Sequence, residues 1–253
     1  MTNDLHNCAA LVERADPDRF RAAMAAPASA RAVLFPLYAF NVEVSRAPWV
    51  TAEAMIAEMR LQWWRDALGE IASGGPVRRH EVVTPLSAIL PAASAQLLDE
   101  YVAARSWDIY NDPFADAEAL GRYLDQTSGH LMVAAAKALG AEDVGAVRDY
   151  AWATGLANWL VSVPDWRARG RRPLPEAPGV VNGLVEQGLD RLTRARAAGV
   201  PKAARAALLP GWRSGAILRR AAAEPERIET GGLLPSPARA QLGLMWQAAT
   251  GRV

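Results

Sequence analysis

The sequence predicts an all-α protein. Alanine, the residue with the highest helix propensity, is abundant along the whole chain of 253 residues. Runs in which apolar and polar residues alternate, as they do in a half-buried strand, are essentially missing. Apolar residues instead recur at helical spacing between proline and glycine breaks.

The first helices begin and end at clear signals. Asp16-Pro17-Asp18 combines an acidic cap with a proline in the first turn, which is typical of a helix start. Pro27 interrupts this helix. A second helix is expected over residues 30–46, because Pro48 breaks the chain again.

The third helix has a wide apolar stripe and is expected to be buried on most of one side. Thr51 caps it, and Glu53 lies in its first turn, where a negative charge suits the helix dipole. Ser73-Gly74-Gly75-Pro76 ends it. The stripe consists of Ile56, Met59, Leu61, Trp63, Trp64, Leu68 and Ile71.

Proline and glycine delimit the remaining helices too. The clearest runs from Ala117 to Gly140, and another covers 143–163, where Pro164 is expected to end it. Further helices are expected over residues 81–90, 92–108, 182–198, 203–222 and 237–249. No repeat or long linker divides the chain, so residues 1–253 are expected to form one helical domain.

Composition narrows the classes of function. The 28 basic and 27 acidic residues nearly cancel, so we expect no nucleic-acid partner. Cys8 is the one cysteine, which excludes an internal disulfide and fits a reducing compartment. The first 20 residues resemble no signal peptide, and no apolar run approaches the roughly 20 residues of a membrane span. We expect a cytoplasmic protein, with peripheral contact at the inner membrane surface left open.

Several segments resemble the squalene/phytoene synthase family. Tyr123, Thr127 and Gly129 reproduce a tyrosine–threonine–glycine pattern of its central helix. The similar segments are 16–46 (DPDRFRAAMAAPASARAVLFPLYAFNVEVSR), 60–68 (RLQWWRDAL), 120–140 (LGRYLDQTSGHLMVAAAKALG) and, more weakly, 155–175 (GLANWLVSVPDWRARGRRPLP). The resemblance implies a terpenoid-synthase-like helical bundle around a central cavity.

The acids that this resemblance calls for are missing from the first motif. Working synthases of the family hold magnesium ions with two acid-rich motifs on facing helices, and the metal neutralises the departing diphosphate. The first motif aligns with residues 45–49, where Ser45 and Trp49 occupy the expected acid positions and Arg46 would repel a metal. Glu43 is a lone acid two residues away, and such a glutamate is more often solvated or paired with an arginine.

The second motif is also without its acids. Residues 158–164 contain none, and Asp165 is the single candidate. Because Pro164 is expected to end the helix, Asp165 should cap it or pair with Arg167 or Arg169. We therefore predict no catalytic residue, no metal ligand and no cofactor, with magnesium required only if the protein is a prenyltransferase.

Two clusters remain as candidate binding groups. Arg60, Arg65 and the pair Trp63-Trp64 form either a cationic mouth over an aromatic wall or, as we favour, core tryptophans with surface ion pairs. Residues 167–172 contain four arginines, which suit a phosphate, an acidic partner, an anionic membrane or plain solvation. By resemblance, the pocket or its mouth should contain Tyr38, Glu43, Arg46, Arg60, Trp64, Tyr123, Thr127, Gly129 and Asp165.

The missing acids favour a non-catalytic function. Pro164, followed by a basic loop ending in Leu174-Pro175, resembles the family's branch of mitochondrial complex I assembly factors. Val161 departs from that branch, which tends to have arginine there. We expect a protein that binds an isoprenoid-like lipid or a protein partner and aids assembly of a respiratory complex. The alternatives are a prenyltransferase that joins two prenyl diphosphates head to head and a lipid carrier without a partner.

Overall fold

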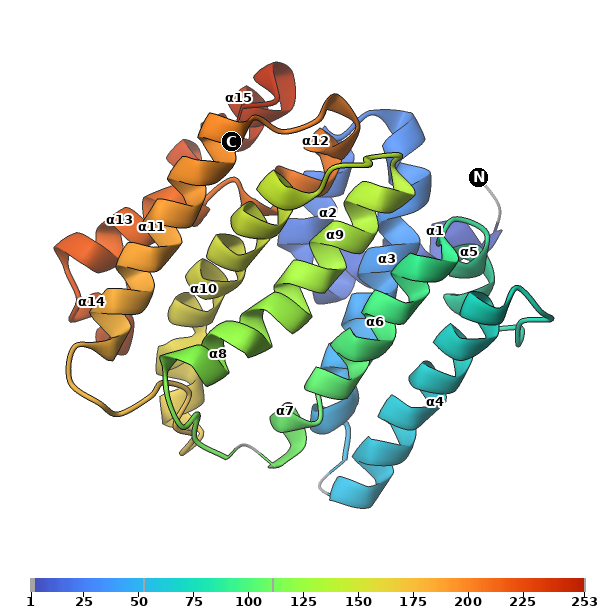
Figure 1. Ribbon diagram of the computed structural model, residues 1–253, viewed down its shortest axis with the longest axis horizontal. Coiled ribbons are helices and arrows are strands. Elements are labelled where there is room, and N and C mark those ends of the chain that lie inside the picture. The colour runs from blue at the N-terminus through green and yellow to red at the C-terminus, as the bar shows by residue number, and fades with distance from the viewer. Residues whose placement is uncertain (1–2, 52, 111, 253) are drawn as a thin grey trace.

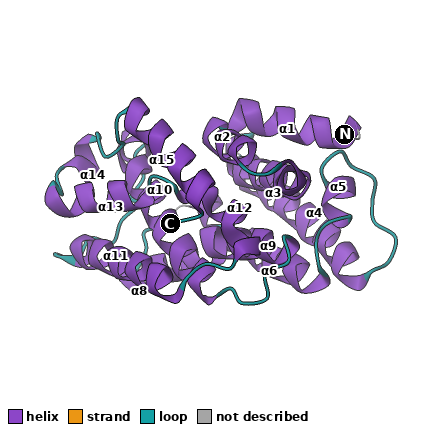
Figure 2. Cartoon of the chain, turned by 90° about the horizontal axis from the view of Figure 1, so that it is seen from above, coloured by secondary structure: helices purple, strands orange, loops and turns teal. Residues whose placement is uncertain are grey.

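Helices make up the structure, a computed structural model that describes residues 3–51, 53–110 and 112–252 (Figure 1). The chain is 76% helical. The described residues contain no strand, and Figure 2 shows helices and loops only. The predicted all-α class is confirmed.

The helical elements follow one another through short connections. They are α1 (Asn3–Ala15), α2 (Pro17–Ala25), α3 (Ala28–Arg46), η1 (Ala47–Trp49), α4 (Ala54–Ser73), α5 (Val83–Ser87), α6 (Ala92–Ala104), α7 (Trp107–Tyr110), α8 (Ala117–Leu124), η2 (Asp125–Gly129), α9 (His130–Ala138), α10 (Gly145–Ala168), α11 (Val180–Ala198), η3 (Lys202–Ala204), α12 (Arg205–Leu208), η4 (Leu209–Gly211), α13 (Ser214–Ala223), α14 (Arg227–Thr230) and α15 (Pro237–Thr250).

The long helices pack side by side. In Figure 1, α4, α6, α9, α10 and α11 run in nearly the same direction across the molecule. Each contacts the next, α4 on α6, α6 on α9, α9 on α10 and α10 on α11. One cluster of buried apolar side chains extends from α1 to α15 and includes Phe40, Tyr101 and Trp152 among its largest members.

Most of the predicted helix signals act as expected. Asp16 caps α2, since its side chain accepts a hydrogen bond from the Arg19 backbone nitrogen at 3.0 Å, and Pro17 is the first helical residue. The helix α4 ends at Ser73, where Gly74 adopts a left-handed conformation with φ 68°. Pro91 precedes α6, as the break between the expected helices predicts.

Several expected boundaries are wrong. The N-cap of α4 is Glu53, and Thr51 instead accepts a hydrogen bond from the Glu53 backbone nitrogen at 3.1 Å in the turn before it. The helix expected over 92–108 is divided into α6 and α7. The helix expected over 203–222 is interrupted by η4, where Pro210 cannot donate a backbone hydrogen bond.

Pro164 does not end its helix. It lies inside α10, which continues to Ala168. A proline inside a helix removes one hydrogen bond and kinks the axis, but tertiary packing can hold the helix together. The end of α10 packs against α14, and the Cγ atom of Pro164 lies 3.9 Å from the Cβ position of Gly231. Asp165 and Arg167 are therefore helical residues rather than parts of a loop.

The central helix contains an unexpected turn. Residues 125–129 form the π-helical turn η2 between α8 and α9, and such turns occur frequently at functional sites. Gly155 of α10 faces this turn. A Cβ atom at Gly155 would lie 2.7 Å from the Cβ atom of Ser128, so only glycine permits this approach of the two helices.

This contact predicts opposite effects for two glycine substitutions within long helices. Gly155→Ala should destabilise the protein by about 1–3 kcal/mol, because the new methyl group overpacks against Ser128. Gly69→Ala in α4 should stabilise it by about 0.5–1 kcal/mol, since no atom lies within 4 Å of that Cβ position. Urea unfolding of both variants measures the change in the free energy of unfolding. Equal changes in the two variants would contradict the close approach of α10 to η2 at Gly155.

Candidate functional site

A cavity lies between α2, α3, α6, the α8–η2 segment and α10. Its volume is about 220 Å³. Polar side chains and aromatic rings line it, among them Arg19, Asn41, Tyr101, Arg105, Thr127 and Asn158. Of the described residues that line it, none is Asp, Glu, His or Cys. This central cavity therefore has a polar wall with two cationic groups.

A buried hydrogen-bond network holds Arg105 in the wall of the central cavity. Asp108 is 2% exposed and accepts hydrogen bonds from the Tyr123 hydroxyl at 2.6 Å and from Arg105 Nη1 at 3.0 Å. Arg105 Nη1 also donates to the Tyr123 oxygen at 3.1 Å. Burial raises the pKa of Tyr123 well above its ordinary value, so the phenol remains a neutral donor.

Arg105 remains charged in this network. Burial alone would lower its pKa, but Tyr101, Tyr123 and Asp108 outweigh that effect and raise the pKa well above its ordinary value. The guanidinium carbon lies 5.1 Å from the ring centroid of Tyr101. An aromatic face stabilises a cation at this distance.

Arg19 stands in the same wall with its own acidic partner. Its Nη1 atom donates to Asp16, and its guanidinium carbon lies 5.9 Å from the ring centroid of Tyr38. The Tyr38 hydroxyl is buried and has no hydrogen-bond partner among the described residues. Nearby, the side-chain oxygen of Asn41 accepts a hydrogen bond from the Tyr101 hydroxyl at 2.8 Å.

Two tryptophans line the cavity, and a third tryptophan and an arginine pack against one of them. Trp166 lines the cavity, and its ring centroid lies 5.2 Å from that of Trp159 and 5.7 Å from that of Trp49. The guanidinium of Arg171 lies 4.2 Å from the Trp49 ring and 4.9 Å from the Trp166 ring. Arg171 Nη1 also donates to the backbone oxygen of Asp108 at 3.1 Å. We call Trp49, Trp159, Trp166 and Arg171 the mouth cluster.

Other arginines of the segment 167–172 pair with acids on the surface. Arg167 pairs with Glu229 at 3.1 Å, and Arg172 pairs with Glu176 at 3.3 Å. Of the alternatives expected for Asp165, the pairing with Arg167 is not made, because Arg167 pairs with Glu229. Asp165 is exposed near the end of α10, and it is not among the residues that line the central cavity.

The sequence-predicted site residues separate into two groups. Tyr123 and Thr127 line the central cavity. Tyr38 does not line it, but its ring lies under the guanidinium of Arg19, which does. Gly129 is buried in η2. A Cβ atom at this position would lie 2.9 Å from the Asp125 carboxylate, so glycine avoids a close contact there.

The second group lies at a separate hollow. Glu43, Arg60 and Trp64 line a depression of about 400 Å³, together with Met59, Trp63, His80 and Ile56. Arg46 is not part of this wall, and it pairs with Glu43 at 3.0 Å.

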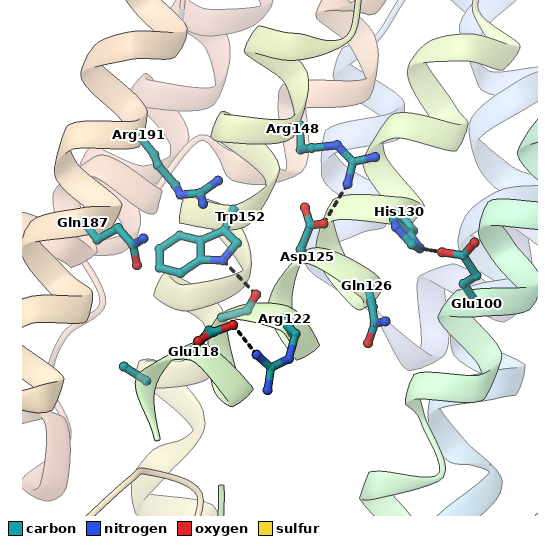
Figure 3. Close-up of a pocket in the computed structure, with 12 residues that line it drawn as sticks. Glu100, Glu118, Arg122, Asp125, Gln126, His130, Arg148, Trp152, Gln187 and Arg191 are labelled. Carbon is teal, nitrogen blue, oxygen red and sulfur yellow. Dashed lines mark hydrogen bonds and ion pairs between the residues drawn. The ribbon is translucent and has the colours of Figure 1, made fainter. Parts of the chain in front are cut away.

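A third hollow occupies the surface between α8, α10 and α11 (Figure 3). Its volume is about 650 Å³, and most of its charged groups pair with one another. Asp125 accepts a hydrogen bond from Arg148 at 2.7 Å, and Glu118 accepts one from Arg122 at 2.5 Å. Burial and Arg148 lower the pKa of His130 at its edge. These internal pairs leave the groove without an obvious ligand.

Large apolar side chains lie exposed beside the mouth cluster. Met55 is 75% exposed and Met59 is 65% exposed at the start of α4. Ile56, Val50 and Trp49 are exposed next to them in the chain. We call these five residues the α4 patch. Large exposed apolar side chains that gather in one part of a protein commonly mark an interaction site.

Sequence comparison places the chain in a family. The family model described as squalene/phytoene synthase matches residues 12–208 of this chain. The chain belongs to the squalene/phytoene synthase family.

The curated relatives carry the name of an assembly factor. The "NADH dehydrogenase (ubiquinone) complex I, assembly factor 6 homolog" of Drosophila melanogaster is 28% identical over 201 residues, 75% of this chain and 59% of that protein. The human "NADH dehydrogenase (ubiquinone) complex I, assembly factor 6" is 23% identical over 188 residues, 72% of this chain and 56% of that protein. The chain thus spans somewhat more than half the length of these relatives.

A solved structure has the same fold. The chain is similar to a dehydrosqualene synthase solved in complex with a ligand, with a TM-score of 0.74 and 14% sequence identity. The match covers 98% of this chain and 96% of that one. The predicted terpenoid-synthase-like helical fold is confirmed.

The described side chains at the positions where the family resemblance expects magnesium-binding acids make other contacts. No group of three or more His, Cys, Asp or Glu side chains among them is placed to hold a metal ion. The Ser45 hydroxyl donates to the backbone oxygen of Asn41 at 2.6 Å, and Trp49 packs on Trp166. Magnesium prefers several oxygen ligands, and the cavity wall provides no carboxylate from the described chain.

Arg19, Asn41, Arg105 and Asp108 were missed by sequence reasoning. The pairs Asp16/Arg19 and Arg105/Asp108 share a spacing of three residues, which places opposite charges on one helix face or across a tight connection. That spacing is a weak signal, since surface pairs show it as often. A second signal is the position of Arg105 directly after an apolar stretch of α6. An arginine in such a position is a candidate for burial.

The two neighbouring tryptophans of α4 differ in burial, so replacing each of them should cost a different amount of stability. Trp64 is 5% exposed and packs on Phe40 with ring centroids 5.3 Å apart. Trp63 is half-buried at the hollow, where Arg78 lies 4.9 Å from its ring. Trp64→Ala should cost about 3–5 kcal/mol of unfolding free energy, and Trp63→Ala clearly less. Urea denaturation checks the order, and a reversed order would show that Trp63 is the core residue.

Proposed function

We propose that this protein is a non-catalytic member of the squalene/phytoene synthase family that binds a ligand and a protein partner and aids assembly of a respiratory complex. The observation that carries the proposal is the wall of the central cavity, which has two arginines and no carboxylate among its described residues. An enzyme that ionises prenyl diphosphates with magnesium needs carboxylates in this wall to hold the metal ions.

The size of the cavity also disfavours head-to-head condensation. Pockets that hold a drug-sized molecule usually have volumes of roughly 300–1,000 Å³. The central cavity, at about 220 Å³, lies below that range, whereas condensation requires two prenyl diphosphates side by side. The separate hollow, at about 400 Å³, lies within that range, and its apolar residues suit an isoprenoid or acyl chain.

The mouth cluster supports the same proposal. Trp49 stands at a position where the family resemblance places a metal-binding acid, and it packs on Trp166 and beneath Arg171. Two indoles and a guanidinium cannot coordinate magnesium.

The role in assembly rests on the relatives and on exposed surface. The curated relatives are named for assembly of complex I. The α4 patch offers apolar surface on which a partner could dock, and methionine-rich surfaces adapt well to partners. No described helix is long and apolar enough to cross a membrane. We propose that the protein works at the inner membrane surface through this patch.

Purified protein should not release diphosphate from farnesyl or geranylgeranyl diphosphate in the presence of magnesium. The reason is the missing electrostatic support for the leaving group, which is usually the largest contribution to such catalysis. The substitutions Ser45→Asp and Trp49→Asp together should not restore turnover, because α10 still lacks its acids near the cavity. An active synthase of the family serves as the positive control, and magnesium-dependent product formation by the wild type would refute the proposal.

Loss of the gene in its own organism should reduce the assembled respiratory NADH dehydrogenase complex on native gels. Wild-type protein should restore the complex, and the double variant Met55→Glu, Met59→Glu should not, because it places charges in the α4 patch. Leu242→Glu, at a residue 66% exposed on α15, is the matched control and should restore assembly. Normal assembly in the deletion strain would refute the role in assembly.

A further inference from the structure

A groove with a volume of about 530 Å³ lies beside the last helix, α15. Its walls come from the connection between α2 and α3, the end of α9, the segment from η3 to η4 and the end of α15. The helix α15 packs on α2, and α12 packs on α9 (Figure 1). We call this the α15 groove. Its described lining shares no residue with the central cavity or with the hollow at Trp63.

Small and apolar side chains form most of the walls of the α15 groove. Among the described residues, seven alanines line it, together with Val33, Leu139 and Leu209. An alanine side chain ends at Cβ, so these residues leave the space between the helices open. Ligand pockets of roughly 300–1,000 Å³ usually combine such apolar walls with a few polar groups that fix the orientation of the ligand. The lining therefore suits a slender, unbranched apolar chain.

The wall formed by α15 is held in place by a buried glutamine. Gln247 is 5% exposed, and its Nε2 atom donates to the Tyr150 hydroxyl at 3.2 Å and to the Leu208 backbone oxygen at 3.3 Å. On the same helix, Leu244 is 8% exposed and belongs to the core. The groove is thus formed before any ligand enters, and a preformed site loses less affinity to ordering.

Two cations line the α15 groove, and its described lining contains no acid. Lys202 and Arg205 are three residues apart in consecutive helical turns, which places them on one side. Neither side chain makes a hydrogen bond or an ion pair in the part of the chain that the structure describes. Residues 19–42 and 191–223, which supply most of the lining, contain no Asp or Glu. The charged groups of the groove are therefore positive.

Two helix ends also meet at the α15 groove, and their effects on an anion oppose each other. The start of α3, at Ser29, carries a partial positive charge of about +0.5, whereas the end of α15, at Ala249, carries about −0.5. Because these partial charges offset each other, the full charges of Lys202 and Arg205 decide which ligands the groove attracts.

We propose that the α15 groove binds a single-chain anionic lipid, with its head at Lys202 and Arg205 and its chain against the alanines. The head is either the carboxylate of a fatty acid or the phosphate of a monoacyl phosphate. Both groups accept charge-assisted hydrogen bonds from arginine and lysine. The site is separate from the central cavity, so the inference does not rest on the proposed function.

Isothermal titration calorimetry with three twelve-carbon amphiphiles tests the inference. Dodecanoate and dodecyl phosphate are the two probes, and dodecyltrimethylammonium is the control with the same chain and a cationic head. We expect both anions to bind at least tenfold more tightly than the cation. Dodecyl phosphate that binds at least tenfold more tightly than dodecanoate assigns the site to a monoacyl phosphate, and any other ratio assigns it to a fatty acid.

A charge variant tests the place of the head group. The double variant Lys202→Gln, Arg205→Gln should weaken the binding of both anions at least tenfold. The matched control is Arg219→Gln, Arg239→Gln, which also removes two exposed positive charges but from residues outside the groove. This control should leave both affinities unchanged within twofold.

A second pair of variants tests the place of the chain. Ala249→Phe puts a ring into the α15 groove and should weaken the binding of both anions at least tenfold. Ala238→Phe adds the same ring to the same helix at an exposed position outside the groove, and should leave the affinities unchanged within twofold. Thermal unfolding of each variant confirms that it is folded before affinities are compared.

Three results would overturn the lipid site. They are the absence of binding of either anion at 1 mM, equal affinity for the anions and the cationic amphiphile, and affinities that neither the charge variant nor Ala249→Phe changes. None of them bears on catalysis, because magnesium-dependent release of diphosphate is the result that would overturn the proposed function.

Discussion

The hydrogen-bond network of Arg105, Asp108 and Tyr123 is the interaction on which the central cavity depends. It joins α7 to the end of α6 and to α8, and the backbone oxygen of Asp108 also accepts a hydrogen bond from Arg171 in the segment after α10. One aspartate thus connects Arg105 in the wall of the cavity to Arg171 of the mouth cluster. Breaking a buried pair by removing one partner typically costs 3–5 kcal/mol, so the network constrains all of these segments together.

The same network determines what charge the cavity presents. Because Asp108 and Asp16 lie behind their arginines, the surface of the cavity carries guanidinium groups, whereas a magnesium centre would require carboxylates. A metal cluster and a pair of arginines both attract a phosphate group, but only the metal cluster also activates it as a leaving group. The proposed function rests on that difference, because the described wall of the cavity carries no carboxylate to hold such a metal.

Sequence reasoning reached the helices more easily than the site. Asp16, Pro17 and Gly74 act locally, through caps and backbone conformation, and their effects were predicted correctly. Pro164 was misread because packing of α10 against α14 outweighs a local preference. The pairing of Arg171 with Trp49 and Asp108 brings together residues more than 50 positions apart, which no spacing rule can foresee without the fold. Trp63 and Trp64 are adjacent in sequence, and only the neighbouring helices decide which of them is buried.

The most direct test of the non-catalytic function is a crystal structure of the protein grown with both diphosphate and magnesium. The account predicts no magnesium ion on protein carboxylates in the central cavity. Magnesium coordinated there by protein carboxylates, with the diphosphate bound through it, would contradict the account.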